Sequence, residues 1–203
     1  GISVNSATSA LHISCLALGV SQNDRVWTSP NSFVASSNCA LYCGAKIDFV
    51  DIDPVTYNMS TSALKKKLSH AKKINKLPKV VIPVHFAGQP CDMIEINKLS
   101  KIYKFKIIED ASHALGASYK NNDKKYKIGS CAHSDITVFS FHPVKIITTG
   151  EGGMAVTNNQ NLSKQLKVLR TSGITKDKNQ MKFKSENSWY YEQLTLGYNY
   201  RMN

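Results

Sequence analysis

The sequence lacks a long apolar run, a paired-cysteine pattern and a secretory leader pattern. No stretch approaches the roughly 20 consecutive apolar residues that a membrane-spanning helix needs. The five cysteines are an odd number without a C-x-x-C pair, which argues against a disulfide framework and against a zinc site. The first residues are typical of a strand, not of a leader peptide. We therefore expect a cytoplasmic protein with reduced thiols, no metal and no membrane partner.

Arginine is also scarce, although the chain is strongly basic. It carries 26 lysines and arginines against 14 aspartates and glutamates, a formal net charge of +12. A basic domain can bind nucleic acid. Here, however, the lysines gather on expected helix faces and loops, and no helix-turn-helix, zinc-finger or RNA-binding signature accompanies them. We interpret the charge as solvated surface and expect no nucleic-acid partner.

Strand and helix patterns alternate along the chain, without an internal repeat or a second core. The predicted strands are 2–5, 25–28, 46–50, 79–84, 106–109, 136–140 and 154–157. The predicted helices are 8–18, 33–43, 62–70, 93–103 and 162–170. This alternation predicts an α/β fold with a mostly parallel seven-stranded sheet flanked by helices, in one domain over residues 1–203. We expect a hairpin turn at 121–126 and a polar, mobile loop at 175–191.

Residues 140–153 place Lys145 on a short turn. An apolar, strand-like run leads into Pro143, and three glycines follow, so that no long helix can form there. A lysine in such a place can attack a carbonyl and form a Schiff base when its pKa is lowered, because only the neutral amine reacts. An ordinary solvated loop lysine would show the same local pattern.

Asp110 ends a short buried strand that begins near Lys106. Ligands of open α/β sheets bind at the carboxyl ends of the strands, which is where this carboxylate would lie. One further strand and its connections fit between Asp110 and Lys145, so the two side chains could face one crevice. Ser140, His113 and Asp110 could also form a hydrolase triad, but the G-x-S-x-G turn of such enzymes is missing.

The segment 4–10 leads from the first predicted strand into an apolar helix. Small and hydroxyl residues at a helix start, here Ala7 and Thr8, leave backbone N–H groups free to hold an anion, and the helix dipole adds to the attraction. An ordinary capped helix explains the pattern equally well. With Ser140 as a further hydroxyl, the three elements suit pyridoxal 5′-phosphate, which needs a lysine for its aldehyde, an anion for its ring nitrogen and a phosphate site.

Six motifs together resemble the DegT/StrS-type family of nucleotide-sugar aminotransferases, which are fold type I pyridoxal-phosphate enzymes. They are NSATSAL (5–11), SPNSFVA (29–35), VHFAGQP (84–90), EDASHALG (109–116), SFHPVKIITTGEGG (140–153) and GYNYRM (197–202). Within the family, residues 141–153 and 189–192 are similar to the transaminases that aminate C4 of a UDP-linked 4-keto-6-deoxy-N-acetylhexosamine in pseudaminic acid biosynthesis. Glutamate is the amino donor that this resemblance leads us to expect.

The resemblance implies a role for each matching residue. Lys145 would bind the cofactor aldehyde and then move the proton during catalysis. Asp110 would pair with the ring nitrogen, and His113 would lie near the ring and its 3-hydroxyl, unless it only caps a turn. Phe33 would stack on the ring, unless it packs in the core, and His142 would touch substrate or orient Lys145. The resemblance assigns the phosphate contacts to Ala7, Thr8, Ser140 and, from a partner subunit, Asn199.

The resemblance also implies a homodimer with shared active sites, and a partial chain. Members of the family begin with an N-terminal arm and continue into a smaller C-terminal domain, and we expect both to lie outside residues 1–203. Three other functions stay open: an aminotransferase for another nucleotide-linked keto sugar, a family dehydratase and a non-catalytic pyridoxal-phosphate module. A dehydratase would carry histidine in place of Lys145. The remaining histidines, His12, His70, His85 and His133, we interpret as structural.

Overall fold

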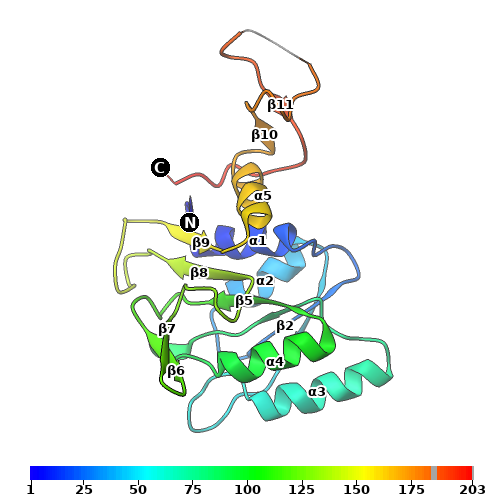
Figure 1. Cartoon of the computed structure of the whole chain (residues 1–203), viewed down its shortest axis with the longest axis vertical. Helices are drawn as coiled ribbons and strands as arrows, with labels where there is room; N and C mark the ends of the chain where they lie inside the picture. The colour runs from blue at the N-terminus through cyan, green and yellow to red at the C-terminus, as the bar shows by residue number, and fades with distance from the viewer. Residues whose placement is uncertain (184–186, 203) are drawn as a thin grey trace.

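A seven-stranded sheet forms the centre of the protein (Figure 1). The computed structural model describes residues 1–183 and 187–202. The strand order is β1-β9-β8-β5-β4-β2-β3, and every pairing is parallel except those of β9 with β1 and β8. The strands are β1 (Ile2–Val4), β2 (Arg25–Thr28), β3 (Lys46–Phe49), β4 (Val80–Ile82), β5 (Lys106–Asp110), β8 (Ile136–Ser140) and β9 (Gly153–Val156). The predicted α/β class and mostly parallel sheet are confirmed.

All five predicted helices are present, four of them with ends shifted by one to three residues and the one at 93–103 with the predicted bounds. They are α1 (Ala7–Ala17), α2 (Ala35–Tyr42), α3 (Thr61–Lys73), α4 (Met93–Tyr103) and α5 (Gln160–Arg170). Four of them begin where a side-chain oxygen accepts a backbone N–H of the first turn, which stabilises a helix start. These N-cap residues are Ser6, Ser60, Asp92 and Asn159.

The helices cover both faces of the sheet, and the strands are accordingly apolar on both sides. Ile107 belongs to a core cluster with Leu64, Leu68 and Ile96 of α3 and α4. The next residue, Ile108, faces the opposite cluster, which includes residues of α1, α2 and α5. Figure 1 shows α3 and α4 together, apart from α1 and α2. The continuous apolar runs of the strands therefore reflect burial between two helix layers.

Two short antiparallel pairs extend from this body. Strands β6 (Ser118–Asn121) and β7 (Lys124–Lys127) form a hairpin, as predicted. Its turn is narrower than the predicted range 121–126, since only residues 122 and 123 lie between the strands. Strands β10 (Ile174–Thr175) and β11 (Glu192–Gln193) form the base of an arm that projects from the body beyond α5 (Figure 1). The predicted loop 175–191 therefore has its first residue in a strand, and its residues 184–186 lie outside the described residues.

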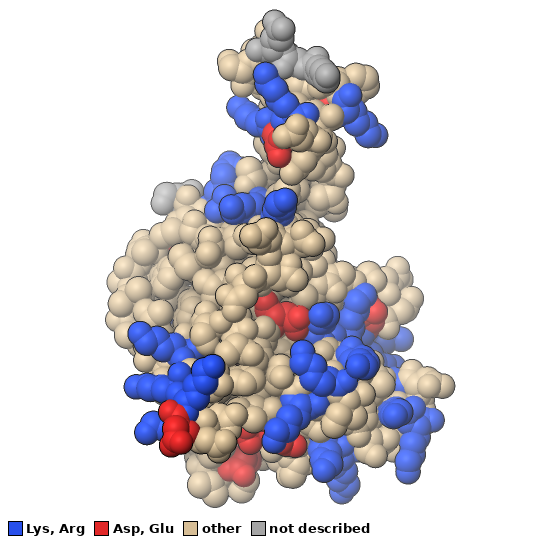
Figure 2. All heavy atoms as spheres, viewed as in Figure 1, with Lys and Arg blue, Asp and Glu red and all other residues tan. Residues whose placement is uncertain are grey.

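The charged side chains form separate clusters on the surface. On the face seen in Figure 2, clusters of lysine and arginine alternate with neutral surface and with acidic side chains. One group lies on α3, where Lys65, Lys66 and Lys73 line a shallow hollow. Within the described residues, no helix combines the length and apolarity that crossing a bilayer demands.

Candidate active site

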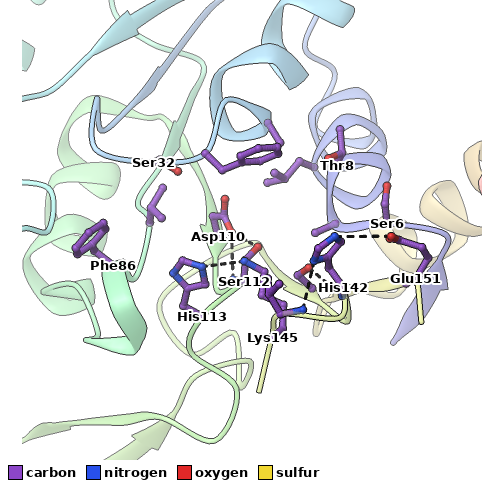
Figure 3. Close-up of a pocket in the computed structure, with 18 of the residues that line it drawn as sticks. Ser6, Thr8, Ser32, Phe86, Asp110, Ser112, His113, His142, Lys145 and Glu151 are labelled. Atoms are coloured by element: carbon purple, nitrogen blue, oxygen red, sulfur yellow. Dashed lines mark hydrogen bonds and ion pairs between the residues drawn. The ribbon is translucent and has the colours of Figure 1, made fainter. Parts of the chain in front are cut away.

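A cavity of about 490 Å³ opens beside the carboxyl ends of β5 and β8 and the first turn of α1 (Figure 3). This is the edge of an α/β sheet at which ligands bind. Apolar side chains also contribute to its wall, among them Val84, Phe86 and Val144. The cavity brings together all predicted site residues except Asn199: Ala7, Thr8, Phe33, Asp110, His113, Ser140, His142 and Lys145.

Lys145 lies in the connection between the antiparallel strands β8 and β9. Backbone hydrogen bonds fold this connection back on itself, with Lys145 N donating to His142 O at 2.9 Å and Phe141 N donating to Gly152 O at 2.9 Å. The lysine side chain points into the cavity, where its Nζ lies 2.8 Å from His113 Nε2 (Figure 3). The turn predicted around Lys145 therefore presents the amine to a specific partner.

The electrostatics of His113 define this contact. Desolvation, followed by the positive charge of Lys145, lowers the pKa of His113, and the opposing charge of Asp110 only partly offsets this. A neutral imidazole is therefore favoured near pH 7. In that state Nε2 can accept a hydrogen bond from Lys145 Nζ. His113 thus orients the side chain of Lys145 in the cavity.

Asp110 ends β5 as a buried carboxylate, and hydroxyl groups hold both of its oxygens. Oδ1 accepts hydrogen bonds from the Ser112 hydroxyl at 2.7 Å and the Ser112 backbone N–H at 3.2 Å. Oδ2 accepts from Ser36 Oγ at 2.7 Å, and Ser36 in turn bonds to Ser32. These hydrogen bonds fix the orientation of the Asp110 carboxyl group, which lines the same cavity as Lys145.

The first turn of α1 offers two backbone donors to the cavity. The N–H groups of Ala7 and Thr8 have no acceptor within residues 1–183 and 187–202, as expected at a helix start. Gly153 of β9 packs so closely here that a Cβ on it would lie 2.5 Å from the Ala7 nitrogen. Ser140, the register partner of Gly153, contributes its hydroxyl nearby. These groups form a cradle for an anion.

Phe33 and His142 both line the cavity. Phe33 is 75% exposed, so the alternative that it packs in the core is wrong. Its side chain instead lines the cavity. His142 Nε2 lies 3.7 Å from Glu151 Oε1, and its carbonyl holds the backbone of Lys145. Sequence reasoning missed Glu151, although it stands within the quoted 140–153 motif.

Two further residues went unrecognised in the sequence. Ser36 lies three positions after Phe33, about one helical turn on. Ser112 lies two positions after Asp110, the spacing at which an aspartate accepts a hydrogen bond from a later residue of its own turn. To predict the contact of Ser36 with Asp110, one would need to know that α2 packs against β5. The contact of Ser112 with Asp110 could have been predicted from the local sequence.

The residues of the hydrolase alternative do not form a triad. Within the described part of the chain, Ser140 Oγ bonds to the His142 backbone N–H at 3.4 Å, and no hydrogen bond joins it to His113. The ring nitrogen of His113 that faces the cavity is occupied by Lys145. This geometry does not activate a serine nucleophile.

Asn199 lies outside the cavity of its own chain. It is exposed and forms an antiparallel bridge with Thr171, next to the point where Asn5 N donates to Tyr200 O at 2.9 Å. The structure thus leaves its side chain free of the Lys145 site of the same chain. Its predicted contact with a partner's phosphate stays a prediction.

A parallel sheet whose edge joins a loop lysine, a buried aspartate and a helix N-terminus in one cavity is the arrangement of a pyridoxal-phosphate-binding domain. The chain belongs to the DegT/DnrJ/EryC1/StrS aminotransferase family, which it matches over residues 1–203. Pyridoxal 5′-phosphate is the cofactor of this family.

Three known proteins illustrate the relationship. UDP-4-amino-4,6-dideoxy-N-acetyl-beta-L-altrosamine transaminase of Campylobacter jejuni is 42% identical over 200 residues, which are 98% of this chain and 48% of the relative. PseC of Helicobacter pylori, an aminotransferase involved in the biosynthesis of pseudoaminic acid, has a TM-score of 0.80 and 32% identity. The match covers 98% of this chain and 48% of the PseC chain. NtdA of Bacillus subtilis, solved with bound cofactor PMP, has a TM-score of 0.79 and 28% identity. The match covers 99% of this chain and 40% of the NtdA chain. This chain thus spans about half the length of the relatives that it matches.

The residues present fit the cofactor. The two free N–H groups of α1 and the close approach of Gly153 suit a phosphate, since a larger side chain would fill that corner. The fixed carboxylate of Asp110 suits a protonated ring nitrogen. Lys145 supplies the amine that the cofactor aldehyde needs, and the exposed ring of Phe33 offers a stacking surface.

Proposed function

We propose that this chain is the cofactor-binding domain of an aminotransferase that transfers the amino group of glutamate to C4 of a UDP-linked 4-keto-6-deoxy-N-acetylhexosamine. The observation that carries the proposal is the approach of Lys145 Nζ to His113 Nε2 in the cavity that also contains Asp110. The 42% identity to a UDP-sugar transaminase favours this substrate class. The surface-glycan route to pseudaminic acid is the context that the PseC likeness favours.

The bound cofactor would supply an electron sink for the carbon that loses its proton. The chain's own residues would bind and orient it. Asp110, fixed by Ser36 and Ser112, would keep the ring nitrogen protonated. The N–H groups of Ala7 and Thr8, with the hydroxyl of Ser140, would hold the phosphate, and Phe33 would cover one ring face.

Lys145 would be the proton carrier of the site. Its Nζ would bind the cofactor at rest and, once released, would take up and return the proton of the reacting carbon. Neutral His113 lies next to Nζ and would orient it by a hydrogen bond. His142, held beside Glu151, would orient the backbone of Lys145 or touch the sugar.

A second subunit would complete the site. Asn199 is exposed and does not reach the cavity of its own chain, so a partner in a two-fold dimer would present it to the phosphate. Mixing Lys145→Ala protein with Asn199→Asp protein would then restore activity, because one site of each mixed dimer has both native residues. The test needs both variants as full-length proteins. A mixture that is no more active than either variant alone would reject the shared site.

The experiment that tests the function uses the full-length protein loaded with pyridoxal 5′-phosphate. Glutamate alone should convert the visible absorption of the bound cofactor to that of the amino form, and a UDP-4-keto sugar should restore it and yield an amino sugar by mass. Lys145→Ala is the inactive control.

The other functions give different results in the same assay. A non-catalytic module would bind cofactor without the glutamate-dependent change. An enzyme for another nucleotide-linked keto sugar would respond to glutamate but would discharge its amino group only to that sugar, for example one linked to GDP.

A further inference from the structure

His85 is a fully buried histidine that the proposed mechanism does not use. It follows β4, and its Nε2 lies 2.9 Å from Oε2 of Glu109, on the sheet face opposite the Asp110 side chain. Its Nδ1 accepts the Cys91 N–H at 3.0 Å, so the ring proton is on Nε2, which donates to the carboxylate. The interpretation of His85 as structural does not say which part of the protein these two bonds hold in place.

The segment 84–91 is a closed loop with a sharp turn. The thiol of Cys91 donates to the Val84 carbonyl at 3.2 Å, so that the last residue is tied to the first. Within the loop, Ala87 and Gly88 both have positive φ, 50° and 86°. A left-handed conformation is unfavourable for alanine and persists only where the surroundings impose it. The shape of the loop therefore depends on its anchors.

The loop forms part of the cavity wall. Phe86, the residue after His85, lines the cavity, and its backbone N–H donates to Asn58 Oδ1 at 2.9 Å (Figure 3). The amide nitrogen of the buried Asn58 donates to two carbonyls further along the loop, at 2.9 and 3.2 Å. Anchors on both sides of the loop thus fix the point at which Phe86 enters the wall.

The loop also contacts two residues that the proposed mechanism uses. The His85 backbone N–H donates to the Asp110 carbonyl at 3.1 Å. Gly88 packs so closely on His113 that a Cβ at this glycine would lie 2.8 Å from the His113 carbonyl oxygen. The His113 ring in turn bonds to Lys145 Nζ. A shift of the loop would therefore move groups that surround the lysine amine.

We propose that His85 is a positioning residue of the Lys145 site, acting from the far face of the sheet. By bonding to the Glu109 carboxylate and the Cys91 N–H, its ring holds the loop in the shape that completes the cavity wall and supports His113. Because the His85 side chain is fully buried on the opposite face, it acts through the loop and not on substrate. The inference rests on the proposed function only in taking Lys145 as the reacting residue.

The test uses the full-length protein and two replacements of His85. His85→Gln keeps a donor near the position of Nε2 but loses the acceptor for the Cys91 N–H, and His85→Ala loses both. The first measurement is the NMR titration of His113 in the cofactor-free protein. In His85→Ala the pKa of His113 should rise toward its ordinary value, because the ring gains contact with water and separates from Lys145. His85→Gln should give an intermediate shift.

The second measurement is the reaction of the cofactor-loaded protein with glutamate. The rate constant at saturating glutamate should fall in His85→Ala by up to about 100-fold, the cost of misplacing a reacting group by about an ångström. The half-saturating glutamate concentration should change less, since His85 does not touch the amino donor. A wild-type protein that does not react with glutamate would contradict the proposed function, whereas the titration of His113 would still test the positioning role.

Ser100→Ala is the matched control for lost stability. The Ser100 hydroxyl is buried toward the carboxyl end of α4 and donates to the Asn97 carbonyl at 2.8 Å. This variant should lower the Tm without changing the His113 titration or the glutamate rate. If Ser100→Ala produced the same changes as His85→Ala, a general loss of stability would explain both and the proposal would be wrong.

Gly88→Ala tests the same path without removing a His85 bond. A Cβ at this left-handed position would press on the His113 carbonyl, so the His113 titration should shift here too. A native His113 titration in a folded His85→Ala protein would overturn the proposal. If His85→Ala does not fold, a native titration in both His85→Gln and Gly88→Ala would overturn it instead.

Discussion

Lys145 Nζ and His113 Nε2 lie 2.8 Å apart, although 32 positions separate the two residues in the chain. Two turns bring them together: the one that leaves β5 after Asp110, and the β8–β9 connection. Since β5 and β8 are parallel neighbours, both turns start at the same sheet edge. The contact is thus a direct consequence of the strand order.

The first prediction concerns the pKa of His113. Lys145 lowers this pKa and Asp110 raises it, so Lys145→Met should shift the titration of His113 to higher pH and Asp110→Asn should shift it to lower pH. Two-dimensional NMR of the imidazole resonances measures both shifts in the cofactor-free protein. His70, an exposed residue of α3, is the internal control, and its resonances should be the same in both variants as in the wild type. Shifts of equal sign in the two variants would contradict the arrangement.

The second prediction concerns Asp110. Asparagine preserves the size of the side chain but removes the charge that would hold the ring nitrogen protonated. Asp110→Asn should therefore retain cofactor and slow proton removal from the amino donor by about three orders of magnitude, or ~4 kcal/mol of barrier. Stopped-flow absorbance after mixing with glutamate measures this rate. Asp123→Asn in the β6–β7 turn is the control, and a native rate in the Asp110 variant would remove this residue from the site.

The third prediction concerns Ser36, which donates to Asp110 Oδ2 at 2.7 Å. Ser36→Ala removes one hydrogen bond to an anion, an interaction of about 1.5–3 kcal/mol. Retention of the cofactor with a roughly tenfold slower proton transfer is expected, since ~1.4 kcal/mol corresponds to one decade. Ser37→Ala is the neighbouring control, because among the described residues the Ser37 hydroxyl bonds only to the Val34 carbonyl. Equal rates in the two variants would show that Ser36 does not position the carboxylate.

The fourth prediction concerns Glu109, which lies on the sheet face opposite Asp110. Cys91 N donates to His85 Nδ1, so His85 Nε2 carries a proton and donates to Glu109 Oε2 at 2.9 Å. Ser134 and Thr137 donate to the other oxygen. Burial opposes ionisation of Glu109, but these hydrogen bonds lower its pKa overall.

A lowered folded-state pKa contributes stability that is present above the unfolded pKa of about 4.3 and is lost as the pH falls through the folded value. The Tm of Glu109→Gln should therefore decrease less than that of the wild type as the pH falls. The Tm of Glu95→Gln should decrease as in the wild type, because Glu95 lies in an exposed pair with Lys98. Thermal unfolding of both variants and the wild type, over the pH range in which Glu109 takes up a proton, tests this expectation. Identical acid profiles of the Glu109 variant and the wild type would contradict the buried anion.

The sequence predicted the sheet, the helices and five of the cavity residues because their signals are local. The other three, Phe33, His113 and His142, were predicted from the family resemblance alone. Apolar runs identify buried strands, and residues such as Asp110 and Ser140 end those strands, so that the parallel topology brings them together. The cavity position of Ala7 and Thr8 follows from the helix start that Ser6 caps. These features need no knowledge of packing between distant elements.

The features that the sequence did not predict depend on such packing. Ser36 donates to Asp110 only because α2 lies over β5, and nothing in its neighbourhood along the chain indicates this. The meeting of Cys15 with Cys39 likewise requires the crossing of α1 and α2. Strands β10 and β11 have two residues each, too few for an alternating pattern to be recognised.

The central claim is that Lys145 binds the cofactor, and reduction with borohydride followed by peptide mapping tests it most directly. The full-length protein is loaded with pyridoxal 5′-phosphate, reduced and digested, and the modified lysine is identified by mass spectrometry. We expect the adduct on Lys145 alone, and neither adduct nor visible absorption of the bound cofactor in Lys145→Ala, whereas Lys127→Ala should behave as wild type. An adduct on another lysine, or one that persists in Lys145→Ala, would contradict the account.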